Sequence, residues 1–172
     1  MEKRIFKAKK QKGLDLSEII LIGVLLAAGA VLKFFVGSII NIGMKPNFII
    51  AMYCLIIILI KPKLKDSIII GVIAGILCQL FPGTPLINIF SEMFGAAAMV
   101  LLLKLPLKLK KFDFSPFVCT FISTLVSGFV FLGCMYIMFF LGTNVVPTAL
   151  SVFLVIILGT ALVNSFIVTI LY

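Results

Sequence analysis

The chain has 172 residues, of which 63% are hydrophobic and 12% are charged, and its mean hydropathy is +1.33. Soluble globular proteins carry roughly 25% charged residues, so this composition excludes an ordinary soluble domain and indicates a polytopic membrane protein. A net charge of +9 suggests nucleic-acid binding when a protein is soluble. Here the basic residues lie between apolar runs, so we expect no nucleic-acid partner.

The basic residues gather in three segments. A membrane span needs about 20 apolar residues, or somewhat fewer when flanking groups reach the interface, so the chain accommodates about six spans. In a six-span arrangement all three segments lie on one side: Lys3, Arg4, Lys7, Lys9, Lys10 and Lys12; Lys61, Lys63 and Lys65; Lys104, Lys108, Lys110 and Lys111. The positive-inside rule then places both termini in the cytoplasm.

These patterns predict an all-α protein with one domain. Residues 1–17 form a basic cytoplasmic arm that contacts anionic lipid. Residues 18–172 form a compact bundle of six transmembrane helices.

The first predicted span, residues 18–37, carries Gly23, Ala27 and Ala30 as a stripe of small residues that allows another helix to dock closely. That helix belongs either to this chain or to a partner subunit. Lys33 lies about one turn from the outer end of this span. Its side chain either snorkels to the outer interface or points into the bundle, where it meets an anion.

The next elements place further polar residues at the outer end. The connection 38–46 contains Asn41 and Lys45, and it leads into a short second span, residues 47–60. The third span, residues 67–80, has Gly71 and Gly75 as a G-x-x-x-G pair, a signal for close helix packing. Gln79 ends this span on the side of the following loop.

A Pro/Gly turn, residues 81–85, follows the third span and begins with Phe81. It is expected to cap a ligand. In the fourth span, Asn88 and Glu92 are four residues apart and therefore share one helix face. An acid within a membrane-spanning helix costs at least ~2.5 kcal/mol and is normally retained for function, so Glu92 is the strongest candidate for a binding residue. The alternative is a neutral, buried Glu92 that serves only packing.

The last two spans are predicted at residues 116–141 and 148–171, joined by an outer turn that contains Asn144. Aromatic side chains in the outer part of the fifth span, Phe131 among them, are interpreted as lipid-facing. Thr160 and Asn164 share one face of the sixth span and are interpreted as packing hydrogen bonds.

Motifs for catalysis or for metal binding are missing from the sequence. There is no phosphate-binding loop, no histidine, and no Cys-x-x-Cys spacing among Cys54, Cys78, Cys119 and Cys134. We therefore expect a protein that is not an enzyme and that holds no metal or cofactor. If it moves a solute uphill, the energy comes from an ion gradient or from a partner protein.

Six short spans, basic cytoplasmic loops and a small-residue stripe resemble the substrate-binding S components of energy-coupling-factor (ECF) transporters. Within that group, four segments are similar to the tryptophan transporter (TrpP-like) family: G-M-K-P-N at 43–47, F-P-G-T-P-L-I-N at 81–88, S-G-F-V-F-L at 127–132 and V-N-S at 163–165. The family pattern favours aspartate at position 47 and Asp-Lys at positions 91–92. This chain has Asn47, Ser91 and Glu92 there, and it also departs from the pattern at Thr84-Pro85.

The resemblance implies a multi-pass protein of the prokaryotic plasma membrane that works with other subunits. Outer loops and helix ends would surround a small ligand, and Gly23, Ala27 and Ala30 would dock on a membrane T subunit. Two separate ATPase subunits would hydrolyse ATP, and the S component would tip in the membrane to release its cargo.

A zwitterionic aromatic substrate suits the candidate residues. Lys33 or Lys45 takes the carboxylate and Glu92 takes the ammonium, while Phe81 stacks on the ring. We expect tryptophan or a related aromatic compound, bound by Lys33, Asn41, Lys45, Gln79, Phe81, Asn88, Glu92 and Asn144. The alternatives are an S component for a vitamin such as biotin, thiamine or a pyridoxal relative, a gradient-driven secondary carrier, and a membrane scaffold that transports nothing.

Overall fold

The structure, a computed structural model, describes residues 13–39, 46–84, 86–105, 108–109, 112–143, 145 and 149–172. Six helices run through these residues: α1 (Leu16–Ile39), α2 (Ile49–Ile60), α3 (Leu64–Cys78), α4 (Ile87–Leu102), α5 (Ser115–Phe140) and α6 (Leu150–Leu171). The only strands in the described part of the chain are β1 (Lys108–Leu109) and β2 (Phe112–Asp113), a two-residue antiparallel ladder between α4 and α5. The predicted helical architecture is confirmed, and the small ladder was not predicted.

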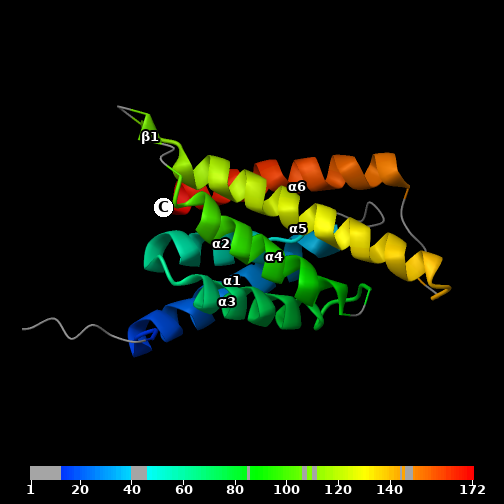
Figure 1. Cartoon of the computed structure of the whole chain (residues 1–172), viewed down its shortest axis with the longest axis horizontal. Coiled ribbons are helices and arrows are strands. Elements are labelled where there is room, and N and C mark those ends of the chain that lie inside the picture. Colours follow the sequence, from blue (N-terminus) through cyan, green and yellow to red (C-terminus); the bar gives the residue numbers. More distant parts are fainter. Residues whose placement is uncertain are drawn as a thin grey trace, which may run out of the picture.

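Three of the described helices are long and apolar enough to cross a membrane: α1 over Leu16–Val36, α5 and α6. The apolar helices α2 and α4 are shorter. With 12 residues, α2 is about 18 Å long, whereas the hydrocarbon core is about 30 Å thick. The six-span count therefore stays a prediction, as does the cytoplasmic location of the termini. The start of α1 and the C-terminus do lie at the same end of the bundle (Figure 1).

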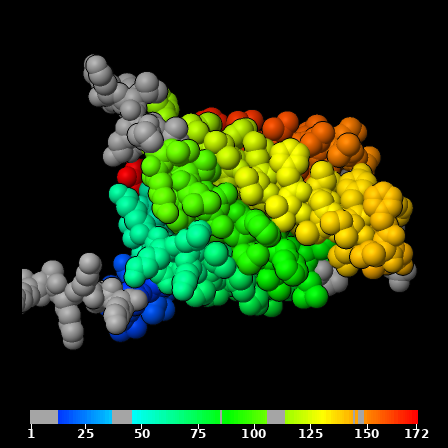
Figure 2. Space-filling view, viewed as in Figure 1, coloured from blue at the N-terminus to red at the C-terminus, as the bar shows by residue number. Residues whose placement is uncertain are grey.

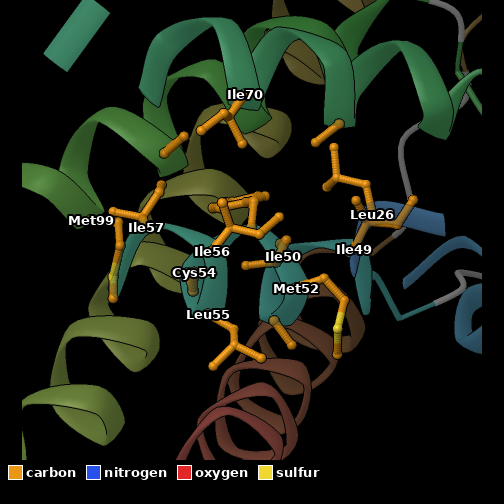
Figure 3. Close-up of a cluster of buried hydrophobic side chains, with 14 of the residues drawn as sticks. Leu26, Ile49, Ile50, Met52, Cys54, Leu55, Ile56, Ile57, Ile70 and Met99 are labelled. Atoms are coloured by element: carbon orange, nitrogen blue, oxygen red, sulfur yellow. The ribbon is translucent and has the colours of Figure 1, made fainter. Parts of the chain in front are cut away.

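Helix α2 is the centre of the fold, because it contacts all five other helices. Its sequence, IIAMYCLIIILI, is apolar on every face, and each residue from Ile49 to Ile58 is buried. A helix that is hydrophobic all round is expected in a core. Figure 3 shows its side chains directed to several sides, towards Leu26 of α1, Ile70 of α3 and Met99 of α4.

Glycines bring α3 and α4 into backbone contact, as the G-x-x-x-G pair predicts. A Cβ added at Gly71 would lie 2.6 Å from the carbonyl oxygen of Glu92, and one added at Gly75 would lie 2.5 Å from the Cα of Ile89. No side chain larger than hydrogen fits at these distances without a shift of the backbone. Figure 2 shows α4 between α3 and α5 on one face of the molecule, with no gap between them. The position of α4, which carries Asn88 and Glu92, is thus set by α3.

Candidate substrate-binding site

A cavity of about 120 Å³ lies between the second half of α1, the start of α2, the first turns of α4, the middle of α5 and the first half of α6, under the turn that follows α3. Its polar lining residues are Lys33, Asn47, Thr84, Asn88, Ser91, Glu92, Thr124, Ser127 and Thr160. Its apolar lining residues are Pro46, Ile50, Pro82, Gly83, Gly128, Phe131, Phe153, Ile156 and Ile157. Such a mixture of an apolar wall and a few convergent polar groups is typical of small-molecule sites.

Glu92 lies at the bottom of the cavity, where its side chain is only 1% exposed. Its Oε1 accepts a hydrogen bond from Nδ2 of Asn47 at 2.6 Å, and its Oε2 accepts one from the hydroxyl of Ser127 at 3.0 Å. Each oxygen keeps a lone pair that these donors do not use. The carboxylate is therefore held in one orientation by Asn47, which precedes α2, and by Ser127 of α5, and it still has capacity for a further donor.

Asn47 holds Glu92 because it is itself fixed just before α2. Its Oδ1 accepts the backbone N–H of Ile49 at 3.3 Å, a contact typical of residues that precede a helix. Its backbone carbonyl accepts a hydrogen bond from Nδ2 of Asn164 at 3.1 Å. An aspartate at position 47 would set a second carboxylate against Glu92. The amide at 47 and the acid at 92 are therefore matched to each other.

Lys33 provides the positive charge of the cavity. It is 7% exposed and belongs to the buried face of α1, so its side chain does not snorkel away from the bundle. Its ammonium group lies 5.3 Å from the centre of the Phe81 ring, a cation–π contact. Among the described residues no ion pair joins Lys33 to Glu92. Lys33 and Glu92, two buried residues of opposite charge type, thus line one cavity without a direct ion pair between them.

The apolar wall contains a pair of aromatic rings from α5 and α6. The rings of Phe131 and Phe153 stack with centroids 6.0 Å apart and an angle of 15° between their planes. The interpretation of Phe131 as a lipid-facing residue was wrong, because its ring turns to α6 and lines the cavity. Thr160, interpreted as a packing residue, also lines the cavity.

The turn after α3 covers the cavity with Pro82, Gly83 and Thr84. Gln79 does not line the cavity. Its Oε1 accepts the backbone N–H of Leu86 at 3.1 Å, so it ties the two ends of the turn together. Phe81 lies under Lys33 and packs against the main apolar core, without lining the cavity.

Comparison with known proteins identifies the family. The family model described as "Tryptophan transporter TrpP" matches residues 15–172, nearly the whole chain. The chain belongs to the TrpP family. A curated relative, the "Probable tryptophan transport protein" of Clostridium acetobutylicum, is 32% identical over 163 residues, which cover 92% of this chain and 91% of the relative. No solved structure matches. The predicted resemblance to the TrpP-like family is confirmed, and the chain is a membrane protein of a transporter family.

In this TrpP-family structure, three of the predicted site residues meet at the cavity: Lys33, Asn88 and Glu92. Three others, Asn41, Lys45 and Asn144, lie outside the described residues. The sequence interpretation missed Asn47, Ser127 and Phe153. The sequence does contain a signal for Ser127, because it follows Ser123 by one helical turn within an apolar run. The signal for Asn47 is weaker and consists of an asparagine just ahead of a predicted apolar helix.

The small-residue stripe of this TrpP-family chain lies outside the packed face of α1. Gly23 and Ala27 are exposed, and a Cβ added at Gly23 would meet nothing within 4 Å. Ala30 is half-buried and packs against the core. The contact between α1 and α2 uses Gly29 instead, where an added Cβ would lie 2.8 Å from the Cγ of Met52. Most of the stripe therefore stays open on the surface of this chain.

Proposed function

We propose that this chain is the substrate-binding subunit of a tryptophan importer in the prokaryotic cell membrane. Its substrate is tryptophan or a related aromatic amino-acid-like compound. The single observation that carries the proposal is the cavity in which Lys33 and Glu92 are both buried without pairing. Burying two charged groups without a direct ion pair between them is costly, so a ligand that supplies both countercharges suits this cavity.

An α-amino acid has the matching charges. Its carboxylate pairs with the ammonium group of Lys33, and its ammonium group donates to the free lone pairs of Glu92. The aromatic pair of Phe131 and Phe153 supplies an apolar surface for an indole ring. The curated relative is named for tryptophan transport, which supports tryptophan over other aromatic amino acids.

We further propose that the chain acts as an ECF-type S component, with a membrane T subunit and two ATPase subunits as partners. The exposed positions Gly23 and Ala27 support this role, because a flat stripe on α1 allows a partner helix to approach closely. The chain itself has no phosphate-binding loop with which to hydrolyse ATP.

The test is a ligand-binding measurement on detergent-purified protein, with tryptophan, the other aromatic amino acids, biotin, thiamine and pyridoxal as ligands. Saturable binding of tryptophan, with no uptake by this protein alone in liposomes, is the expected result. Binding of a vitamin alone would refute the substrate. Uptake driven by an ion gradient without partners would refute the S-component role, and absence of any binding would favour a membrane scaffold.

Replacing Phe131 with Ala is expected to lower the affinity for tryptophan about tenfold. The change removes a stacked ring from the cavity wall, and such aromatic contacts contribute about 0.5–1.5 kcal/mol beyond their buried area. Phe129→Ala is the matched control, because Phe129 lies on the same helix and is 50% exposed. Isothermal titration checks both variants. Equal losses in the two variants would contradict a direct role of Phe131.

Replacing Ala27 with Leu is expected to reduce tryptophan uptake several-fold in cells that carry the partner subunits, and to leave tryptophan binding by the purified protein unchanged. The added side chain prevents close approach of a partner helix on the open stripe. Ala28→Leu makes the same change at a neighbouring exposed position that faces about 100° away around the helix. If Ala27→Leu transports like the unmodified protein, the stripe is not the docking surface.

A further inference from the structure

A second cavity, of about 510 Å³, lies at the opposite end of the bundle from Glu92. It is formed where α2 ends, at Ile58 and Lys61, where α4 ends, at Val100 and Lys104, and where α5 begins, at Pro116; Tyr172 closes one side. The substrate cavity uses the other ends of α2 and α4, with Asn47 before α2 and Asn88 in the first turn of α4. The two cavities share no lining residue, so this one needs an explanation of its own.

The floor and the rim of this cavity differ in chemistry. Ile58, Val100 and Pro116 are buried and form an apolar floor. Lys61 and Lys104 are exposed and form a basic rim. No acidic side chain belongs to the described lining, and neither lysine forms an ion pair within the described residues. Within the described lining, the two ammonium groups above the apolar floor therefore face no acidic side chain.

The surroundings of the cavity indicate the kind of anion. Leu59, Leu101, Leu105 and Phe114 lie next to the lining residues in sequence or belong to the lining, and all four are exposed. Exposed apolar side chains in these segments favour a phospholipid over a soluble anion, because a phospholipid places its phosphate directly above its acyl chains. Basic pockets between membrane helices on the cytoplasmic side bind anionic head groups, and the positive-inside rule assigns this end to the cytoplasmic leaflet.

We propose that this second cavity is a binding site for one anionic phospholipid. The phosphate lies between the ammonium groups of Lys61 and Lys104, and the start of an acyl chain lies against Ile58 and Val100. This site holds the ends of α2 and α4 together at the end of the bundle where no substrate binds. The lipid is therefore a structural ligand, independent of the substrate.

The test uses native mass spectrometry of the full chain, purified with an equal mixture of phosphatidylglycerol and phosphatidylcholine of the same acyl chains. The unmodified protein should retain one phosphatidylglycerol in preference to phosphatidylcholine. A lysine near a membrane surface contributes about 1 kcal/mol, so Lys61→Gln and Lys104→Gln should each lower the retention about fivefold, and the double variant about 25-fold. The control is Lys63→Gln with Lys65→Gln, which removes the same charge from exposed lysines that do not line the cavity. The control should retain the lipid.

Several outcomes would overturn the proposal. If the Lys63/Lys65 control lost as much lipid as the Lys61/Lys104 variant, the lipid would be held by diffuse charge attraction and not by a site. If the protein did not prefer phosphatidylglycerol to phosphatidylcholine, no anionic lipid would be selected. Displacement of the lipid by millimolar inorganic phosphate would show a site for soluble anions. Full lipid retention by the Lys61/Lys104 double variant, with loss of tryptophan uptake in cells, would assign the surface to a protein partner. Tryptophan binding, measured on the same samples, should be unchanged in all variants because the two cavities are separate.

Discussion

Replacing Glu92 with Gln is expected to weaken tryptophan binding by at least about thirtyfold. The charge pair that is lost joins Glu92 to the ammonium group of the bound substrate. Removing one member of a buried, hydrogen-bonded charge pair costs about 2–5 kcal/mol, and every 1.4 kcal/mol is a factor of ten in affinity. The fold should persist, because a glutamine fills the same space. The hydroxyl of Ser127 can accept a hydrogen bond from the new amide, whose carbonyl oxygen can still accept one from Asn47.

Two analogues of tryptophan separate the roles of the two charges. Tryptamine lacks the carboxylate, and indole-3-propionate lacks the ammonium group. Glu92→Gln should weaken the binding of tryptophan and of tryptamine and leave indole-3-propionate unaffected. Lys33→Gln should weaken the binding of tryptophan and of indole-3-propionate and leave tryptamine unaffected. Isothermal titration of each variant with each ligand provides the measurement.

The control for Glu92→Gln is Glu18→Gln, the same change in the first turn of α1, remote from the cavity. It should bind all three ligands like the unmodified protein. The opposite result, in which Lys33→Gln binds indole-3-propionate as tightly as the unmodified protein does, would refute the assignment of the two charges. Unchanged tryptophan affinity in Glu92→Gln would remove Glu92 from the site altogether.

Replacing Gly75 with Ala is expected to lower the free energy of unfolding by about 1–3 kcal/mol, the usual cost of overpacking a well-packed interior. The new methyl group would lie 2.5 Å from the Cα of Ile89 and 2.8 Å from the carbonyl oxygen of Asn88. Both are backbone atoms, so α4 itself must move. Because α4 carries Asn88 and Glu92, tryptophan affinity should fall together with stability.

Gly133→Ala is the matched control for this variant. Gly133 also lies inside a helix, but an added Cβ there would meet nothing within 4 Å. Alanine has the higher helix propensity, so this variant should be as stable as the unmodified protein or more stable. Thermal unfolding in detergent and tryptophan titration provide both readouts. A Gly75→Ala protein with unchanged stability and affinity would show that α3 does not position α4.

The sequence by itself determined the helical class, the approximate bounds of the helices and the importance of the buried acidic residue that lines the cavity. The predicted spans 18–37 and 116–141 correspond to α1 (Leu16–Ile39) and α5 (Ser115–Phe140). These features follow from local composition, because long apolar runs form helices in a membrane whatever lies next to them. Glu92 was predictable for the same local reason, since an acid is rare in such a run. The glycine pair of α3 was predictable from its spacing alone.

Only the tertiary structure decided which helix faces meet. The pattern of α2 is apolar all round and carries no preferred face, so its central position could not be predicted from periodicity. The partners of Glu92 come from residues 45 and 35 positions away in the chain, Asn47 and Ser127, and no local pattern connects them. The direction of Lys33 and of Phe131 was likewise open, because in a membrane a helix is apolar on its lipid side and on its packed side alike. The candidate site of this TrpP-family protein is therefore a product of helix packing, in which hydrogen bonds and close glycine contacts select the faces that hydrophobicity leaves undecided.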